Sequence, residues 1–168
     1  VGDIFVDKTK EYGLAGVKGV HLYAVDANDD GATDLVVLDD FQASPQFYFF
    51  DKKSKQFKLG KNPFNEITRA SYLVFVDLDH DGILDVIVGN LNQKSEMIQY
   101  PASLYRGIAD NGKLIYQKKA ELPTGVLPTA SIVPFDFNLD GEMDLFFANW
   151  FSQNGAGPKP VPDVLLKG

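Results

Sequence analysis

The residues best suited to chemistry are acidic and amide side chains crowded into three short segments, 26–35, 77–86 and 136–145. Each segment follows the pattern D-x-[DN]-x-D-G-x-x-D and then an apolar residue. The pattern places four oxygen-bearing side chains within nine residues, with glycine at position 6. Ca²⁺ takes about six to eight oxygen ligands, so this crowding predicts a calcium site in each segment.

The predicted ligands are the side chains at positions 1, 3, 5 and 9 and the backbone carbonyl at position 7. They are Asp26, Asn28, Asp30, Ala32 and Asp34; Asp77, Asp79, Asp81, Ile83 and Asp85; and Asp136, Asn138, Asp140, Glu142 and Asp144. Glycine at position 6 is expected where a side chain would obstruct the turn or its φ. Intervening residues such as Asp29 and His80 should point away from the ion. The second segment has four carboxylates against three in the others, so we expect it to bind calcium most tightly.

A simple acidic turn, an EF-hand and a magnesium site fit the pattern less well. One acidic segment alone could be a turn without an ion, but three in register favour metal sites. An EF-hand needs a bidentate Glu at position 12 and flanking helices. Position 12 here is Val37, Val88 or Phe147, each continuing an apolar run. Mg²⁺ is disfavoured because it retains waters and prefers strict octahedral geometry.

The acidic segments belong to an internal repeat of predicted strands. β-branched and aromatic runs flank each segment, which makes it the loop of a β-hairpin. The expected first and second strands are 21–25 and 34–38, 72–76 and 85–89, and 131–135 and 144–148. Third strands are expected at 46–50, 103–107 and 163–167, and fourth strands at 55–59 and 113–117. An unmatched fourth strand is expected at residues 3–8.

This order predicts an all-β fold built of β-propeller blades. The chain is interpreted as one region, 1–168, with antiparallel four-stranded repeats at about 20–59, 71–117 and 130–168. Residues 3–8 would supply a closing fourth strand. Propellers typically have about four to eight blades, so the three repeats are expected to be part of a larger propeller. The alternative is a compact stack of three sheets.

The repeated motif resembles the FG-GAP and VCBS-type calcium-binding β-propeller repeats found in the integrin α-subunit head. Residues 5–14 are also similar to the F-x-D-x-T-x-x-x-G-L segment common in secreted proteins with such repeats. The resemblance implies that calcium loops brace one face of the blades while ligands bind elsewhere. It does not extend to integrin-like ligand specificity, because the FG and GAP segments are poorly kept and the GAP tripeptide is absent.

Strand order predicts where a partner would bind. Successive connections of an up-and-down meander alternate between faces, so the long connections lie opposite the calcium loops. Variable loops on a rigid scaffold commonly carry recognition. The candidate partner-binding residues are Met97, Tyr100, Trp150 and Phe151. The alternative for Trp150 and Phe151 is packing between blades or against a neighbouring domain.

Composition limits the function. The net charge of −7 argues against nucleic acid and anionic membranes as partners, and no apolar run predicts membrane insertion. The chain lacks cysteine and has only two histidines, His21 and His80, and no catalytic motif emerges. The favoured hypothesis is a non-catalytic, calcium-stabilised module that binds an extracellular or cell-surface protein or carbohydrate, with further blades from the same or another chain.

Two alternatives remain for the function. The chain could be an accessory part of a larger secreted hydrolase or polysaccharide lyase, or a structural component of a surface assembly. Millimolar calcium is found outside the cytoplasm, so we expect a secreted, cell-surface or periplasmic location.

Overall fold

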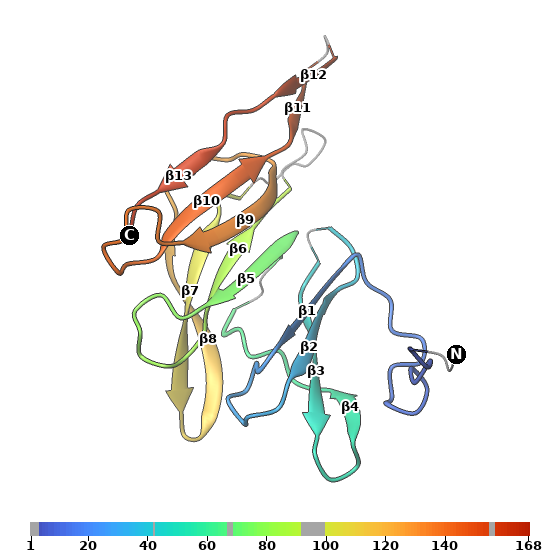
Figure 1. The fold of residues 1–168 in the computed structure, drawn as a ribbon. Coiled ribbons are helices and arrows are strands. Elements are labelled where there is room, and N and C mark those ends of the chain that lie inside the picture. The colour runs from blue at the N-terminus through green and yellow to red at the C-terminus, as the bar shows by residue number, and fades with distance from the viewer. Residues whose placement is uncertain (1–3, 42, 67–68, 92–99, 155–156) are drawn as a thin grey trace.

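The structure is a computed structural model that describes residues 4–41, 43–66, 69–91, 100–154 and 157–168. These residues form two four-stranded sheets, one three-stranded sheet and one two-stranded hairpin, all antiparallel (Figure 1). In the described ranges no helix is long and apolar enough to cross a membrane. The all-β prediction is confirmed.

The sheets follow the predicted repeats. The first sheet contains β1 (His21–Val25), β2 (Asp34–Leu38), β3 (Gln46–Asp51) and β4 (Gln56–Leu59) in that order. The second contains β5 (Tyr72–Val76), β6 (Asp85–Gly89), β7 (Ser103–Asp110) and β8 (Lys113–Glu121). The third has the order β13 (Val164–Leu166), β10 (Asp144–Asn149) and β9 (Thr129–Phe135). Pro134, which cannot donate to a ladder, lies in β9 at the edge of this sheet.

The core lies in two layers, one on each side of the second sheet. One apolar cluster joins the first and second sheets and includes Phe47, Val86, Tyr105 and Tyr116. The other joins the second and third sheets and includes Ile87, Ile132, Leu145 and Phe147. Because successive side chains of a strand point to opposite faces, β6 serves both clusters, and all five of its residues are buried. The sheets therefore stack one on the next.

The strand predicted at residues 3–8 is not found. Residues 4–8 belong to no strand, and Phe5 is 90% exposed. The Asp7 carboxylate accepts the Thr9 N–H at 2.9 Å and begins a series of turns, after which the Phe57 N–H donates to the Tyr12 carbonyl at 2.9 Å. Apolar, β-branched residues favoured a strand, but no sheet edge among the described residues pairs with them.

The long connection between β10 and β13 contains regular structure that the strand order did not predict. It contains β11 (Phe151–Asn154) and β12 (Gly157–Pro160), paired as a hairpin that projects from the third sheet (Figure 1). Pro158 and Pro160 lie in β12, although proline is disfavoured within strands. Proline is tolerated in this hairpin because β12 is an edge strand with one partner.

Candidate metal centres in the three acidic loops

Each acidic segment is the hairpin loop between the first and second strand of its sheet. Loop 1 (26–33) joins β1 to β2, loop 2 (77–84) joins β5 to β6, and loop 3 (136–143) joins β9 to β10. The glycine at position 6 has a positive φ in every loop, at 79° in Gly31, 87° in Gly82 and 92° in Gly141. The predicted need for glycine is therefore confirmed.

Position 4 also has a positive φ, which the sequence did not reveal. The residues are Asp29 (57°), His80 (58°) and Leu139 (61°). This conformation costs a non-glycine residue roughly 1–2 kcal/mol. Two left-handed residues two positions apart wind each loop tightly and bring its side-chain oxygens together.

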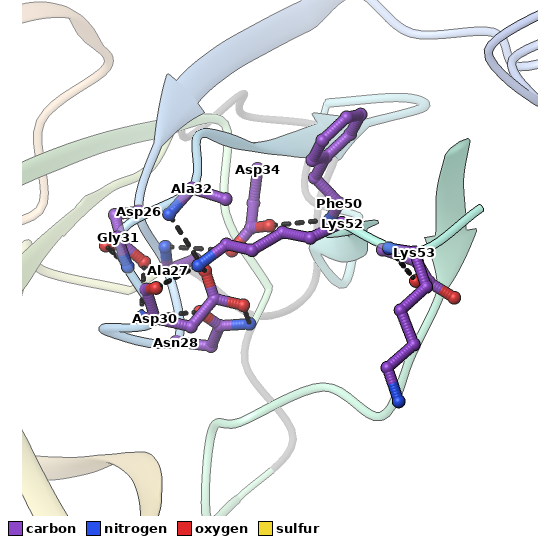
Figure 2. A network of polar contacts seen from close by, with 11 residues as sticks. Asp26, Ala27, Asn28, Asp30, Gly31, Ala32, Asp34, Phe50, Lys52 and Lys53 are labelled. Atoms are coloured by element: carbon purple, nitrogen blue, oxygen red, sulfur yellow. Dashed lines mark hydrogen bonds and ion pairs between the residues drawn. The ribbon is translucent and has the colours of Figure 1, made fainter. Parts of the chain in front are cut away.

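The loop backbone orients the carboxylates at positions 1 and 5. In loop 1, Asp26 accepts the N–H groups of Asp30 at 3.0 Å and Gly31 at 2.7 Å (Figure 2). Asp30 in turn accepts the Ala32 N–H at 2.8 Å. The equivalent bonds form in loops 2 and 3, at 2.8–3.2 Å. These side chains are thus held over their own loop in all three repeats.

Position 3 distinguishes loop 2 from the others. The side-chain oxygens of Asn28 and Asn138 each accept the N–H of the position 5 residue. Their side-chain N–H groups donate to the position 5 carboxylate, at 3.1 Å for Asn28 and 2.8 Å for Asn138. Loop 2 has Asp79 instead. Among the described residues, Asp77, Asp79 and Asp81 each contribute one carboxylate oxygen to a group whose three oxygens lie within 4.8 Å of one another.

The position 9 aspartates join each loop to the third strand of its sheet. Asp34 is fully buried, and its two oxygens accept the N–H groups of Ala27 at 3.1 Å and Phe50 at 2.7 Å (Figure 2). Asp85 and Asp144 are buried and accept the corresponding pairs of N–H groups. Burial raises the pKa of Asp34, and the nearby carboxylates of Asp30 and Asp26 raise it further. A carboxylate oxygen with one bonded N–H keeps a second lone pair for another ligand.

A basic side chain from the third strand, or from the residues just after it, contacts each loop. Lys52 lies 3.2 Å from an Asp30 carboxylate oxygen and also contacts the Asp30 carbonyl (Figure 2). Arg106 contacts Asp79 and Asp85 in loop 2. Lys167 lies 2.8 Å from Asp140 in loop 3, and this hydrogen bond is the main reason that the pKa of Asp140 falls to about 2.

Sequence reasoning missed these three cations. An alignment of the third strands could have found two of them. Tyr105 and Leu166 pair with motif position 10, and the next residue is Arg106 in one repeat and Lys167 in the other. Lys52 lies in the turn from β3 to β4, which shares a face with loop 1 as the meander predicts.

Loops 2 and 3 meet through a histidine. The His80 Nε2 atom lies 3.2 Å from the Gly141 carbonyl oxygen. His80 is at position 4, so its ring is directed at the neighbouring loop, as expected for an intervening residue. The two loops are therefore side by side on one face of the stacked sheets.

The structure describes three of the four candidate partner-binding residues. Tyr100 lines a cavity of about 360 Å³ together with Arg69, Ser103, Tyr105 and Lys118. Trp150 is 50% exposed, and its ring meets that of Phe151 edge-on at 6.4 Å, at the base of the β11–β12 hairpin. Met97 lies outside the described residues.

The family comparison agrees with the motif. The family model for FG-GAP-like repeats matches residues 7–88, which include loops 1 and 2. This match confirms the resemblance to FG-GAP-type repeats that the motif indicated. No curated protein matches the chain.

Proposed function

We propose that this protein is a calcium-stabilised β-propeller module that binds an extracellular or cell-surface protein or carbohydrate and has no catalytic activity. One observation carries the calcium proposal. In all three loops the backbone holds the position 1 and position 5 carboxylates over the same small region. The basic side chain beside each loop offsets only one of its carboxylate charges, and the negative charge that remains favours a further cation.

The donor set fits calcium in its chemistry. The loops offer carboxylate, amide and carbonyl oxygens, and the chain contains no cysteine that would favour a softer metal. The side chains at positions 1, 3, 5 and 9 and the position 7 carbonyl would hold the ion. When bound, the ion would supply positive charge that offsets the crowded carboxylates and ties the first and second strands together.

The stacking of the sheets supports the propeller part of the proposal. The first strand of one sheet lies near that of the next, and the Leu73 N–H of β5 donates to the Tyr23 hydroxyl of β1 at 2.9 Å. Leu22 of β1 and Val133 and Phe135 of β9 remain exposed on the outer sheets. Additional blades of the same or another chain would bury these apolar side chains, as the described sheets do between themselves.

The proposed ligand surface lies on the connections away from the calcium loops. Trp150 and Phe151 offer exposed aromatic faces, and Tyr100 lines a cavity that also contains acidic, basic and hydroxyl side chains. Aromatic faces with nearby polar groups suit protein anchors and sugar rings. Calcium-dependent stability and such a surface are consistent with a secreted, cell-surface or periplasmic protein.

Thermal unfolding tests the calcium proposal. A ligand that binds only the folded state at 100 times its Kd stabilises it by about 2.7 kcal/mol per site. For a chain of this size, each kcal/mol raises the melting temperature by about 2–4 °C. We expect a clear rise when EDTA is replaced by millimolar CaCl₂, and a smaller rise with MgCl₂ at equal ionic strength. Identical melting temperatures in EDTA and calcium would refute the proposal.

A further inference from the structure

Loop 2 and the third strand of its sheet carry a contacting pair of residues, Asp79 and Arg106, that the other two repeats lack. Position 3 is Asp79 where loops 1 and 3 have asparagine, and Arg106 of β7 lies beside the loop. The third strands align through Tyr48, Tyr105 and Leu166, which pair with motif position 10. The residue after each of these is Phe49, Arg106 or Lys167. The same position in the three repeats therefore carries an aromatic ring in the first, a guanidinium group in the second and an ammonium group in the third.

Arg106 bridges two predicted calcium ligands. Its Nη2 atom donates to Oδ2 of Asp79, and its Nη1 atom donates to Oδ2 of Asp85. The Arg106 side chain is 26% exposed, whereas the Lys52 and Lys167 side chains are 55% and 57% exposed and bond to position 5. A guanidinium remains charged at any pH the protein meets, and its fork matches carboxylate oxygens. The bridge therefore occupies oxygens at positions 3 and 9 that a metal ion would need.

The bridge is not required to shape the loop. Loop 1 has Phe49 in the corresponding place, yet its position 1, 5 and 9 aspartates accept the same backbone N–H groups. The additional carboxylate of loop 2 and the guanidinium instead form a matched pair. Four carboxylates with Arg106 have a net charge of −3, against −2 for the three ligand carboxylates of loop 1 with Lys52.

We propose that Arg106 is a tethered counter-ion that competes with Ca²⁺ for Asp79 and Asp85. It stabilises loop 2 without metal and weakens calcium binding there. This inference rests on the proposed calcium function, and it reverses the expectation that the loop with four carboxylates binds calcium most tightly. Loop 2 becomes the last of the three loops to fill as the calcium concentration rises.

A site-resolved titration tests the competition. The position 6 amides of Gly31, Gly82 and Gly141 each donate to their own position 1 aspartate, so each reports on one loop. The whole chain is labelled with ¹⁵N-glycine and titrated with CaCl₂ by NMR. In Arg106→Gln, we expect the Gly82 midpoint to fall by about tenfold or more, because the charge-assisted contacts to Asp79 and Asp85 are both lost. The Gly31 and Gly141 midpoints should not change.

Two further variants guard against indirect effects. Arg106→Lys keeps the charge without the fork and should give an intermediate Gly82 midpoint. Lys167→Gln changes the equivalent residue of the third repeat and should leave Gly82 unaffected. In EDTA, Arg106→Gln should melt about 2–4 °C below the wild type because loop 2 loses its internal cation.

The outcomes separate this inference from the calcium proposal. If the glycine amides respond to calcium but the Gly82 midpoint is the same in Arg106→Gln, the competition is refuted and the calcium proposal stands. If no loop glycine responds in either protein, both fail. A Gly82 midpoint that falls in Arg106→Gln, while the Gly31 and Gly141 midpoints do not change, would support the competition.

Discussion

The position 9 aspartates have a structural role that their motif does not reveal. Each is buried and bonded to one N–H of its own loop and one of the third strand. The position 5 aspartates, by contrast, are exposed. The two positions should therefore differ in their effect on stability without metal.

Replacing Asp34 with alanine should cost about 2–4 kcal/mol of unfolding free energy in EDTA. The substitution leaves the N–H groups of Ala27 and Phe50 without their acceptors, and an unpaired buried donor costs about 1–3 kcal/mol. Asp30→Ala is the matched control in the same loop and should change the free energy in EDTA by less than about 1 kcal/mol. Urea unfolding measures both. Equal losses would show that Asp34 is no more than another ligand position.

At this scale, the sequence predicts residue types better than contacts. Oxygen side chains at fixed spacing are visible in the sequence, and so is the glycine with positive φ at position 6. The positive φ of Leu139 is not visible, because closure of the loop overrides the local preference of that residue. The Arg106 bridge depends on the register between β6 and β7, which local sequence does not specify.

At the scale of elements, hairpins with a strong alternating or apolar pattern were predicted accurately. The pairs β1–β2 and β5–β6 have the expected bounds because the motif between them marks where the first strand ends and the second begins. Residues 4–8 were predicted to form a strand and do not, whereas the β11–β12 hairpin was not predicted, and the reasons are opposite. The first segment has strand-forming residues without a partner, and the second pairs despite its prolines.

The β11–β12 hairpin gives the clearest test of the proposed ligand surface. Trp150 is half-exposed at its base, so Trp150→Ala should change the unfolding free energy by less than about 1 kcal/mol. Phe147→Ala, in the preceding strand, removes a fully buried ring and should cost about 3–5 kcal/mol. Trp150→Ala should nevertheless abolish binding to ligands identified on a glycan or extracellular-protein array. A stability loss as large as that of Phe147→Ala would instead assign Trp150 to the core.

For the whole molecule, the central finding is a stack of three antiparallel sheets with their acidic loops in equivalent places. The internal repeat predicted the order of strands and loop within each sheet. The described residues form no closed ring, so blades of a larger propeller stay a prediction. The repeat did not predict that Leu22, Val133 and Phe135 would be exposed on the outer sheets, because their exposure depends on how the sheets pack.

The number of calcium ions bound per chain tests the account most directly. Equilibrium dialysis of the whole chain against saturating calcium, with the bound metal measured by atomic absorption, should give three ions per chain. Asp81→Ala removes a carboxylate from the group in loop 2 and should give two. Binding of three ions would support one site per repeat. Absence of bound calcium at millimolar concentration, or the same number in the wild type and Asp81→Ala, would contradict it.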